Sequence, residues 1–318
     1  MMENRAVKLK IGTRGSKLAL TQCGWVQRQI VTALGDDPMQ SQEIAPLIVI
    51  STAGDRIQDR RLIEAGGKQL FTKEIEEALL RGDIDIAVHS LKDMPAEEIP
   101  GLALCAIPVR EDPRDAFLSR NYESLEALPR GARLGTASLR RQAQSLAERP
   151  DLDIVMMRGN VDTRLAKLQA GDCDALLLAA AGLNRLGLSD HIRSYIDPEL
   201  SASAPGQGAL AVQCRVSDLG APWMSRLHDE ATFLRVQAER GALEALEASC
   251  RTAVGAYASL SEGGLSLFVE ALSADGTKRW QRRGHLKDPL PQSARDLGLR
   301  LGDEIKNEAG PDLILVGG

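Results

Sequence analysis

Short apolar runs alternate with longer amphipathic stretches in the first third of the chain. The runs at 7–11, 46–51 and 84–88 predict three buried strands. Between them, apolar residues recur every three or four positions over 19–33 and 71–81, which predicts two helices, each ended by a glycine. The order strand–helix–strand–helix–strand is typical of a parallel sheet covered by helices.

The second third of the chain repeats this plan. Apolar runs predict strands at 133–136, 152–157 and 174–181. Helical spacing of apolar residues predicts helices over 139–146 and 161–168, the second one capped by Asn160 and ended by Gly171. A second lobe of the same kind as the first is therefore expected.

Two pairs of segments also match in sequence between these halves. GTRGSKLAL (12–20) resembles GTASLRRQA (135–143), and RGDIDIAVHS (81–90) resembles AGDCDALLLA (170–179). Both pairs fall at equivalent places in the repeated plan. Two α/β lobes normally enclose a cleft, and ligands bind at the carboxyl ends of the strands.

The last third differs from the other two. A long helix is predicted over 229–248, a hairpin with strands 265–272 and 279–283, and a terminal helix over 294–307. The segment 201–215 is rich in small residues, and we expect it to cross back between the lobes. The fold class is thus α/β, with two lobes of mixed, mainly parallel sheet and a small C-terminal α+β domain.

Composition narrows the class of protein. The chain has 318 residues, enough for two or three domains of about 100–200 residues each. The net charge of −5 and the 3% content of aromatic residues argue against a nucleic-acid partner. No apolar run reaches the ~20 residues that span a bilayer, and the N-terminus does not resemble a secretory signal. The cysteines are scattered and odd in number, so we expect a reducing, cytoplasmic location and no metal site.

Arginines gather where strands are predicted to pass into helices. Arg140 and Arg141 lie in the first turn of a predicted helix, where a cation is unfavourable by up to ~1 kcal/mol unless an anion lies beside it. Arg14 and Arg158 hold similar positions. One such arginine would be a solvated surface residue, but four favour a polyanionic ligand. Because the chain lacks the phosphate and dinucleotide glycine motifs, a ligand with many carboxylates fits best.

Three other residues are candidates for chemistry. Asp93 follows Lys92 just beyond the buried strand in DIAVHSLKDMP, where a carboxylate could transfer protons or stabilise a cation. The alternative is a loop salt bridge. Lys68 is either an anion contact or a surface lysine. Cys250 lies beside Arg251, which would favour its thiolate form.

Eight ordered motifs resemble those of the porphobilinogen deaminase (hydroxymethylbilane synthase) family. The resemblance runs in order from residue 8 to about 255, and its motifs are TRGSKLAL, GGKQLFTKEIEEALL, DIAVHSLKDMP, REDPRDAF, GTASLRRQAQ, RGNVDTRLAKL, AAAGLNRLGL and APGQGALAV.

This resemblance implies three domains and a defined reaction. The first two domains would resemble the lobes of periplasmic binding proteins. Their expected bounds are 1–108 with 209–226, and 109–208, and the third domain would span 227–318. The implied enzyme condenses four porphobilinogen molecules head to tail onto a covalent dipyrromethane primer. It releases ammonia at each step and finally hydrolyses off linear hydroxymethylbilane, in tetrapyrrole and heme biosynthesis.

The resemblance also implies roles for individual residues. Asp93 would be the catalytic carboxylate, and Cys250 would hold dipyrromethane through a thioether. Cofactor contacts would be Ser90, Lys92, Thr136, Ser138, Arg140, Arg141, Arg158 and Gln207. Substrate contacts would be Arg14, Ser16, Lys68 and Arg185. No metal and no membrane partner are implied, and the enzyme would be a monomer.

One departure from the family pattern falls at the attachment cysteine. Ala248 and Ser249 precede Cys250 where the family commonly has two glycines, and Ala253 stands where a proline is common. Two other functions remain alternatives: a two-lobed anion-binding protein without catalysis, and a transferase that uses phosphate.

Overall fold

The computed structural model describes residues 8–56, 70–97, 99–247 and 252–313. The chain forms two compact units. Unit 1 comprises residues 1–58, 69–110 and 209–232, and unit 2 comprises 59–68, 111–208 and 233–318. Among the described residues, no helix is both long and apolar enough to cross a membrane.

A five-stranded sheet forms the centre of unit 1, with the strand order β2-β1-β3-β10-β4. Its strands are β1 (Ile11–Thr13), β2 (Leu47–Val49), β3 (Ile86–Ser90), β4 (Leu102–Ala106) and β10 (Leu210–Arg215). Strand β1 is parallel to β2 and β3, whereas β10 is antiparallel to both of its neighbours. Four strands therefore run in one direction, and the strand that arrives from the distant part of the chain runs the other way.

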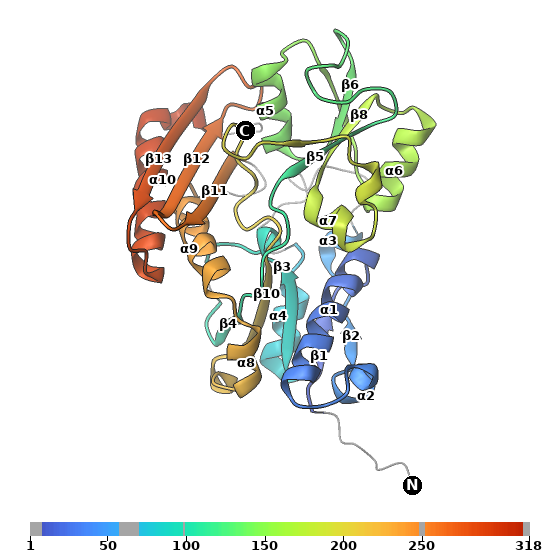
Figure 1. Ribbon diagram of the computed structural model, residues 1–318, viewed down its shortest axis with the longest axis vertical. Helices are drawn as coiled ribbons and strands as arrows, with labels where there is room; N and C mark the ends of the chain where they lie inside the picture. The colour runs from blue at the N-terminus through green and yellow to red at the C-terminus, as the bar shows by residue number, and fades with distance from the viewer. Residues whose placement is uncertain (1–7, 57–69, 98, 248–251, 314–318) are drawn as a thin grey trace. The chain divides into compact units, whose positions relative to one another are not determined.

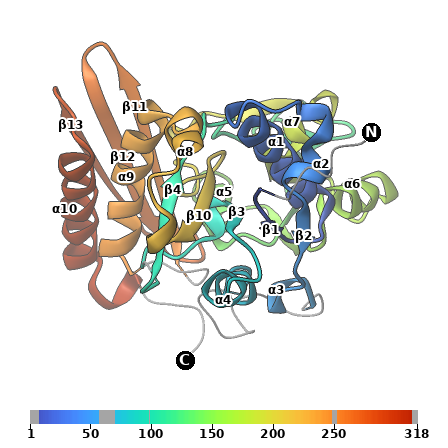
Figure 2. The same cartoon turned by 90° about the horizontal axis from the view of Figure 1, so that it is seen from below.

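Helices cover both faces of this sheet (Figure 2). Helices α1 (Lys17–Ala33) and α8 (Pro222–Leu227) lie on one face, and α4 (Lys73–Arg81) lies on the other. Cys23, Val26 and Ile30 of α1, at three of the predicted apolar positions, are buried in a core that they share with β1, β3 and β10. The buried apolar residues of α4 form a separate small core with Ile84 and Ala87. The short elements of the unit are α2 (Ser41–Ile44), α3 (Ala53–Arg56) and the 3-10 turns at Pro38–Gln40, Leu91–Asp93 and Val216–Asp218.

Unit 2 contains a second five-stranded sheet with the order β7-β6-β8-β5-β9. Its strands are β5 (Asp115–Ser119), β6 (Arg133–Thr136), β7 (Asp153–Met156), β8 (Ala175–Ala179) and β9 (Ser194–Ile196). Its helices are α5 (Leu139–Glu148), α6 (Val161–Ala170) and α7 (Ala180–Arg185), and a 3-10 turn spans Ser189–His191. Strand β6 is parallel to β7 and β8, and β5 is antiparallel to both neighbours, so the topology matches that of unit 1.

The segments that match in sequence between the two lobes also match in structure. Asp85 and Asp174 end the two matching Gly-Asp-x-Asp segments, and each accepts a hydrogen bond from a backbone N–H at the start of the neighbouring strand, at 2.7 Å in both units. Gly82 and Gly171 end helices α4 and α6 in the left-handed conformation, with φ of 78° and 84°. The expectation of two equivalent lobes with mixed, mainly parallel sheets is confirmed.

Unit 2 also contains an antiparallel sheet of β11 (Ala253–Ser261), β12 (Gly264–Leu272) and β13 (Arg279–Leu286) (Figure 1). One face of β11 and β12 shares a core with α9 (Glu230–Ala245) and α10 (Pro291–Ala309). A 3-10 turn at Gly310–Leu313 follows α10. On the opposite face, Ala253 and Leu272 pack against Ala143 of α5. The expected C-terminal α+β part is therefore present, and it packs against helix α5 of the same unit.

Some predicted boundaries were wrong. The strand predicted over 174–181 ends at Ala179, where α7 begins. The segment 201–215 contains β10, an internal strand of the unit 1 sheet. The first strand was expected at 7–11 but is described at Ile11–Thr13. The three-domain bounds stay a prediction.

Candidate functional site

The helices that follow β6 and β7 begin with side-chain caps. Ser138 accepts a hydrogen bond from the backbone N–H of Arg141 at 3.4 Å, and Thr136 Oγ1 accepts one from the Ser138 N–H at 3.1 Å. Asn160 caps α6 through the Thr163 N–H at 2.8 Å. Predicted site residues of unit 2 thus lie where the strands pass into helices, as expected for a ligand site in an α/β sheet.

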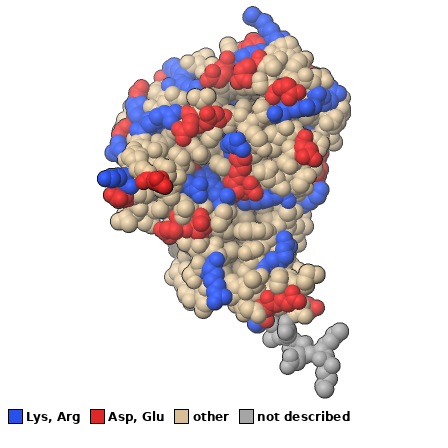
Figure 3. Space-filling view, viewed as in Figure 1, with Lys and Arg blue, Asp and Glu red and all other residues tan. Residues whose placement is uncertain are grey.

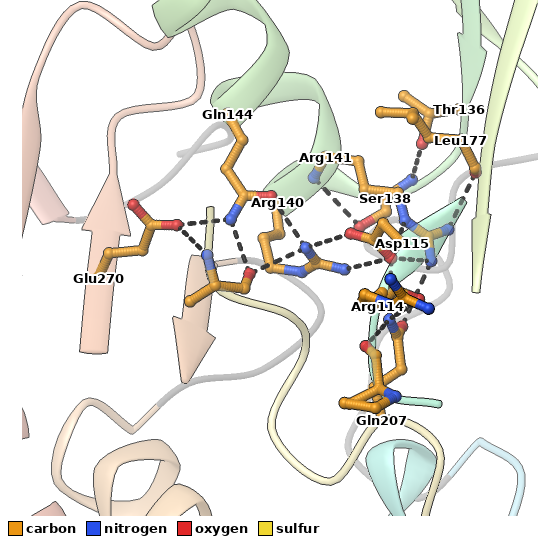
Figure 4. A network of polar contacts seen from close by, with 12 residues as sticks. Arg114, Asp115, Thr136, Ser138, Arg140, Arg141, Gln144, Leu177, Gln207 and Glu270 are labelled. Atoms are coloured by element: carbon orange, nitrogen blue, oxygen red, sulfur yellow. Dashed lines mark hydrogen bonds and ion pairs between the residues drawn. The ribbon is translucent and has the colours of Figure 1, made fainter. Parts of the chain in front are cut away.

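An internal carboxylate binds the adjacent arginines (Figure 4). Asp115 Oδ2 accepts from Arg140 Nη1 at 2.7 Å, and Asp115 Oδ1 accepts from Arg141 Nε at 3.0 Å and Nη2 at 2.7 Å. All three side chains are buried, with 4–6% of each residue exposed. Burial raises the pKa of Asp115, but the two guanidiniums outweigh this and hold that pKa far below its ordinary value. The anion that the sequence led us to expect among these arginines is therefore at least in part Asp115.

Arg140 is also bound on its other side. Its Nη1 donates to Gln144 Oε1 at 2.8 Å and to the carbonyl oxygen of Ala202 at 3.1 Å. Gln144 donates in turn to Glu270 Oε1 at 2.7 Å, and Arg279 Nε donates to Glu270 Oε2 at 2.8 Å. A continuous polar network therefore joins α5 to strand β12 (Figure 4).

The guanidiniums of Arg141, Arg158 and Arg164 act on one another in unit 2, and among the described residues only Arg141 is paired with a carboxylate, that of Asp115. Arg158 Nη1 is buried and has no hydrogen-bond partner in that part of the chain. Burial lowers the pKa of Arg164 to about 10, and the charges of Arg141 and Arg158 contribute. Arg164 Nε donates to the Gly159 carbonyl at 2.9 Å. Because like charges and unpaired buried donors are costly, this arrangement is suited to a ligand that bears carboxylates.

Arg164 was missed in the sequence. It lies four residues after the Asn160 cap, so it projects from the same first turn of α6 that Arg158 precedes. That spacing within RGNVDTR was the signal that could have identified it.

Two further predicted residues, Arg185 and Gln207, make hydrogen bonds within unit 2. Arg185 Nη2 donates to the Gly208 carbonyl at 2.8 Å. Burial lowers the pKa of Arg185 to about 10, although the nearby charge of Glu111 raises it. Gln207 is fully buried, and its Nε2 donates to the Pro113 carbonyl at 2.8 Å and to Asp115 Oδ1 at 2.9 Å.

In unit 1, Arg14 is held by an acidic and an aromatic side chain. Its Nε donates to Asp55 Oδ1 at 3.0 Å, and its guanidinium lies 4.1 Å from the centroid of the Phe71 ring. Thr52 donates to the other oxygen of Asp55 at 2.8 Å. Burial raises the pKa of Asp55, but Arg14 and Thr52 outweigh it, and the pKa falls below its usual value. Ser16 caps α1 by accepting from the Ala19 N–H at 3.2 Å.

The end of β3 leads from the core to the surface. Ser90 donates to Gln22 Oε1 at 3.0 Å, and the chain then makes the 3-10 turn at Leu91–Asp93. Lys92 and Asp93 are exposed on this turn. A solvent-facing carboxylate thus follows a buried strand, as the sequence predicted.

The candidate residues divide between the two units. Unit 1 contains Arg14, Ser16, Ser90, Lys92 and Asp93, and unit 2 contains Thr136, Ser138, Arg140, Arg141, Arg158, Arg185 and Gln207. Lys68 and Cys250 lie outside the described residues. No cluster of metal-binding side chains occurs in the described part of the chain.

Charge is mixed on the face of the molecule shown in Figure 3. Lys and Arg side chains alternate there with Asp and Glu, and no broad region of one sign is visible. Arg140 and Arg141, by contrast, are buried.

Comparison with known proteins identifies the family. The family model described as porphobilinogen deaminase, dipyromethane cofactor binding domain, matches residues 9–221, and the model of the porphobilinogen deaminase C-terminal domain matches residues 233–307. The chain belongs to the porphobilinogen deaminase family. Porphobilinogen deaminase from Caulobacter vibrioides is 58% identical over 320 residues, which cover 98% of this chain and 99% of the relative. The family's protein from Phenylobacterium zucineum is 59% identical over 315 residues, covering 96% and 98%.

Membership makes this chain a transferase with a dipyrromethane cofactor. The donor set fits that group, because a dipyrromethane made from porphobilinogen carries several carboxylates. Unit 2 presents Arg141, Arg158 and Arg164 together, with a buried guanidinium nitrogen of Arg158 unpaired among the described residues. The sequence resemblance and its implied activity are thereby confirmed, while the roles of single residues stay predictions.

Proposed function

We propose that this chain condenses four porphobilinogen molecules head to tail with release of ammonia, and that Asp93 is the catalytic carboxylate. The observation that carries the proposal is the identity of 58% over nearly the whole chain, which includes the DIAVHSLKDMP segment. The exposed position of Asp93 on the turn after β3 supports this role, because a reacting group must reach its substrate.

Cys250 would hold the dipyrromethane, which would supply the pyrrole chain end for the condensation. Residues of unit 2 would hold its carboxylates, chiefly Arg141, Arg158 and Arg164. Thr136 and Ser138 add hydroxyl groups beside the same helix start. Arginine suits this role because its fork-shaped donor set matches a carboxylate at two points.

Asp93 acts on the substrate in two ways. Its carboxylate accepts a hydrogen bond from a pyrrole N–H, which orients the ring. It also offsets the positive charge that develops on the substrate as ammonia leaves. Lys92 beside it would bind a cofactor carboxylate, and the bond from Ser90 to Gln22 holds the end of β3 to α1 beneath this turn.

Arg14, Ser16, Lys68 and Arg185 would contact the incoming substrate. Arg14 is bound by Asp55 in this structure, so a substrate carboxylate would exchange with that side chain. We further propose that the enzyme is a cytoplasmic monomer with the three domains 1–108 with 209–226, 109–208, and 227–318. A phosphate-using transferase lacks support, since no phosphate-binding glycine motif is present.

Replacement of Asp93 by Asn tests the catalytic role. The shape of the side chain is kept and its charge is lost, so kcat should fall by about 10²-fold or more, the usual loss when a positioned acid–base group is removed. The measurement is the rate of ammonia release and of hydroxymethylbilane formation from porphobilinogen.

The matched control is Asp83→Asn. Asp83 is also exposed in unit 1, and it pairs with Arg81 instead of lying beyond β3. The control should keep kcat within about twofold of the wild type, as surface changes usually do. If Asp93→Asn turned over at the control rate, the carboxylate would have no catalytic role. A wild-type chain that bound porphobilinogen without releasing ammonia would instead favour a binding protein.

A further inference from the structure

Asp115 was not a predicted site residue, yet it binds three residues that were. Its Oδ1 accepts from Arg141 Nε and Nη2, from Gln207 Nε2, and from Arg140 Nη2 at 3.3 Å. Its Oδ2 accepts from Arg140 Nη1. One buried carboxylate thus meets five donor contacts from Arg140, Arg141 and Gln207 (Figure 4).

These contacts fix the guanidinium of Arg141 from several directions. Nε and Nη2 lie against Asp115, Nη2 is also 3.3 Å from Gln207 Oε1, and Nη1 donates to the Leu177 carbonyl at 3.1 Å. A guanidinium has five N–H groups, and Nη1 retains one beyond these bonds. The side chain is therefore held in one orientation while it keeps a donor for a ligand.

Charge gives Asp115 a second effect. Arg140 and Arg141 are adjacent and buried, and the charge of Arg141 acts together with that of Arg158 on Arg164. Asp115 compensates one of these four charges. Three positive charges then remain uncompensated by Asp115, and a ligand with several carboxylates would neutralise them.

We propose that Asp115 is a positioning residue, which acts through Arg141 to set the affinity of the unit 2 site for the carboxylates of the growing pyrrole chain. The inference rests on the proposed function, because it concerns the same arginine cluster. If Asp115 had only a structural role, its ion pairs would stabilise the unit without affecting ligand affinity.

A double-mutant cycle tests the proposal on the full-length holoenzyme. Asp115→Asn and Arg141→Lys are made singly and together, and KM, kcat, melting temperature and the fraction of chains that carry dipyrromethane are measured. Each single change should raise the KM for porphobilinogen about tenfold, with a smaller effect on kcat. The KM of the double variant should lie within about twofold of the higher of the two single-variant KM values, because both changes remove the same interaction.

Asp151→Asn is the matched control. Asp151 also forms a two-point pair with an arginine, accepting from Arg149 Nε and Nη2 at 2.8 Å each, in the same unit and outside the network. The Asp151→Asn variant should have an unchanged KM. When it is combined with Arg141→Lys, the effects of the two changes on KM should multiply. If Asp115→Asn behaved like this control, or if its effect on KM multiplied with that of Arg141→Lys, Asp115 would not act through Arg141.

A second variant covers the case in which Asp115→Asn does not fold. Asp115→Glu keeps the charge that compensates the guanidiniums, but it moves the carboxylate by one methylene in a buried site. We expect a folded protein with KM raised several-fold. A wild-type KM in this variant would overturn the proposal. Absence of turnover in the wild type and in Asp151→Asn would instead overturn the proposed function, so the two failures are distinct.

Discussion

At the residue scale, the arginines divide into paired and unpaired groups, and the difference has consequences for stability. Arg140 is bound by Asp115, Gln144 and Ala202, whereas a buried nitrogen of Arg158 lacks a partner among the described residues. Burial of an unpaired donor costs about 1–3 kcal/mol. We therefore infer that Arg158 contributes to ligand binding and not to the stability of the fold.

This difference predicts opposite effects of two substitutions. Arg158→Met removes the unpaired donor and one of three like charges, so the ligand-free chain should be unchanged in stability or stabilised by about 1 kcal/mol. The same change should raise the KM for porphobilinogen about tenfold. Thermal melting with and without porphobilinogen, together with steady-state kinetics, measures both effects.

Arg149→Met is the comparison. Arg149 is paired with Asp151 and also donates to the carbonyls of Leu125 and Leu128, so its loss should lower the melting temperature and leave KM unchanged. A destabilised Arg158→Met with wild-type KM would show that Arg158 belongs to the fold and not to the site.

The sequence identified the arginines but not their partners. The excess of cations at helix starts was visible because it opposes the helix dipole. Asp115 was hidden, since it lies in the REDPRDAF motif about 25 residues from Arg140, and only strand β5 brings it under α5. Long-range ion pairs of this kind depend on sheet order, which the local pattern does not contain.

At the element scale, β3 carries a buried histidine immediately before the exposed turn with Asp93. His89 is 6% exposed, and its Nε2 lies 3.2 Å from Gln213 Oε1 of β10. Burial, with a contribution from Arg14, lowers the pKa of His89 to about 4, although Gln213 raises it. The ring is therefore neutral in the folded protein at neutral pH.

This shift predicts a pH dependence of stability. The unfolded chain binds a proton at His89 near pH 6.5, and the folded chain binds it only near pH 4, so the free energy of unfolding falls as the pH drops through this window. The loss should reach about 2 kcal/mol at pH 5. Denaturant unfolding of the wild type and His89→Gln between pH 7 and 5 measures it. Equal pH dependence in both proteins would contradict the prediction.

Helices were predicted better than strands. The helices α5 and α6 begin and end near the predicted residues, because a side-chain cap marks the start of each helix and Gly171 marks the end of α6. Strands β5 and β10 were not predicted as strands, although each is internal to its sheet. Each of them pairs in the antiparallel sense with strands that lie far from it along the chain, which no short-range periodicity reveals.

At the scale of the whole molecule, the repeated sheet topology explains why candidate residues come from two places in the sequence. Each unit presents the ends of parallel strands, and each provides a different group of side chains, with the proposed catalytic carboxylate in unit 1 and the arginine cluster in unit 2. Through Ala253 and Leu272, the C-terminal sheet packs against α5, the helix that carries Arg140 and Arg141. The segment with Cys250 directly precedes that sheet in the chain.

The most direct test of the account is the intact mass of the purified chain. The wild type should carry the added mass of two porphobilinogen-derived pyrrole units, and Cys250→Ser should show the mass of the bare polypeptide. Cys23→Ser, which changes a buried core cysteine of unit 1, should retain the added mass. A wild-type chain at the bare polypeptide mass, active on porphobilinogen, would contradict a covalent dipyrromethane, and added mass on Cys250→Ser would place the attachment at another residue.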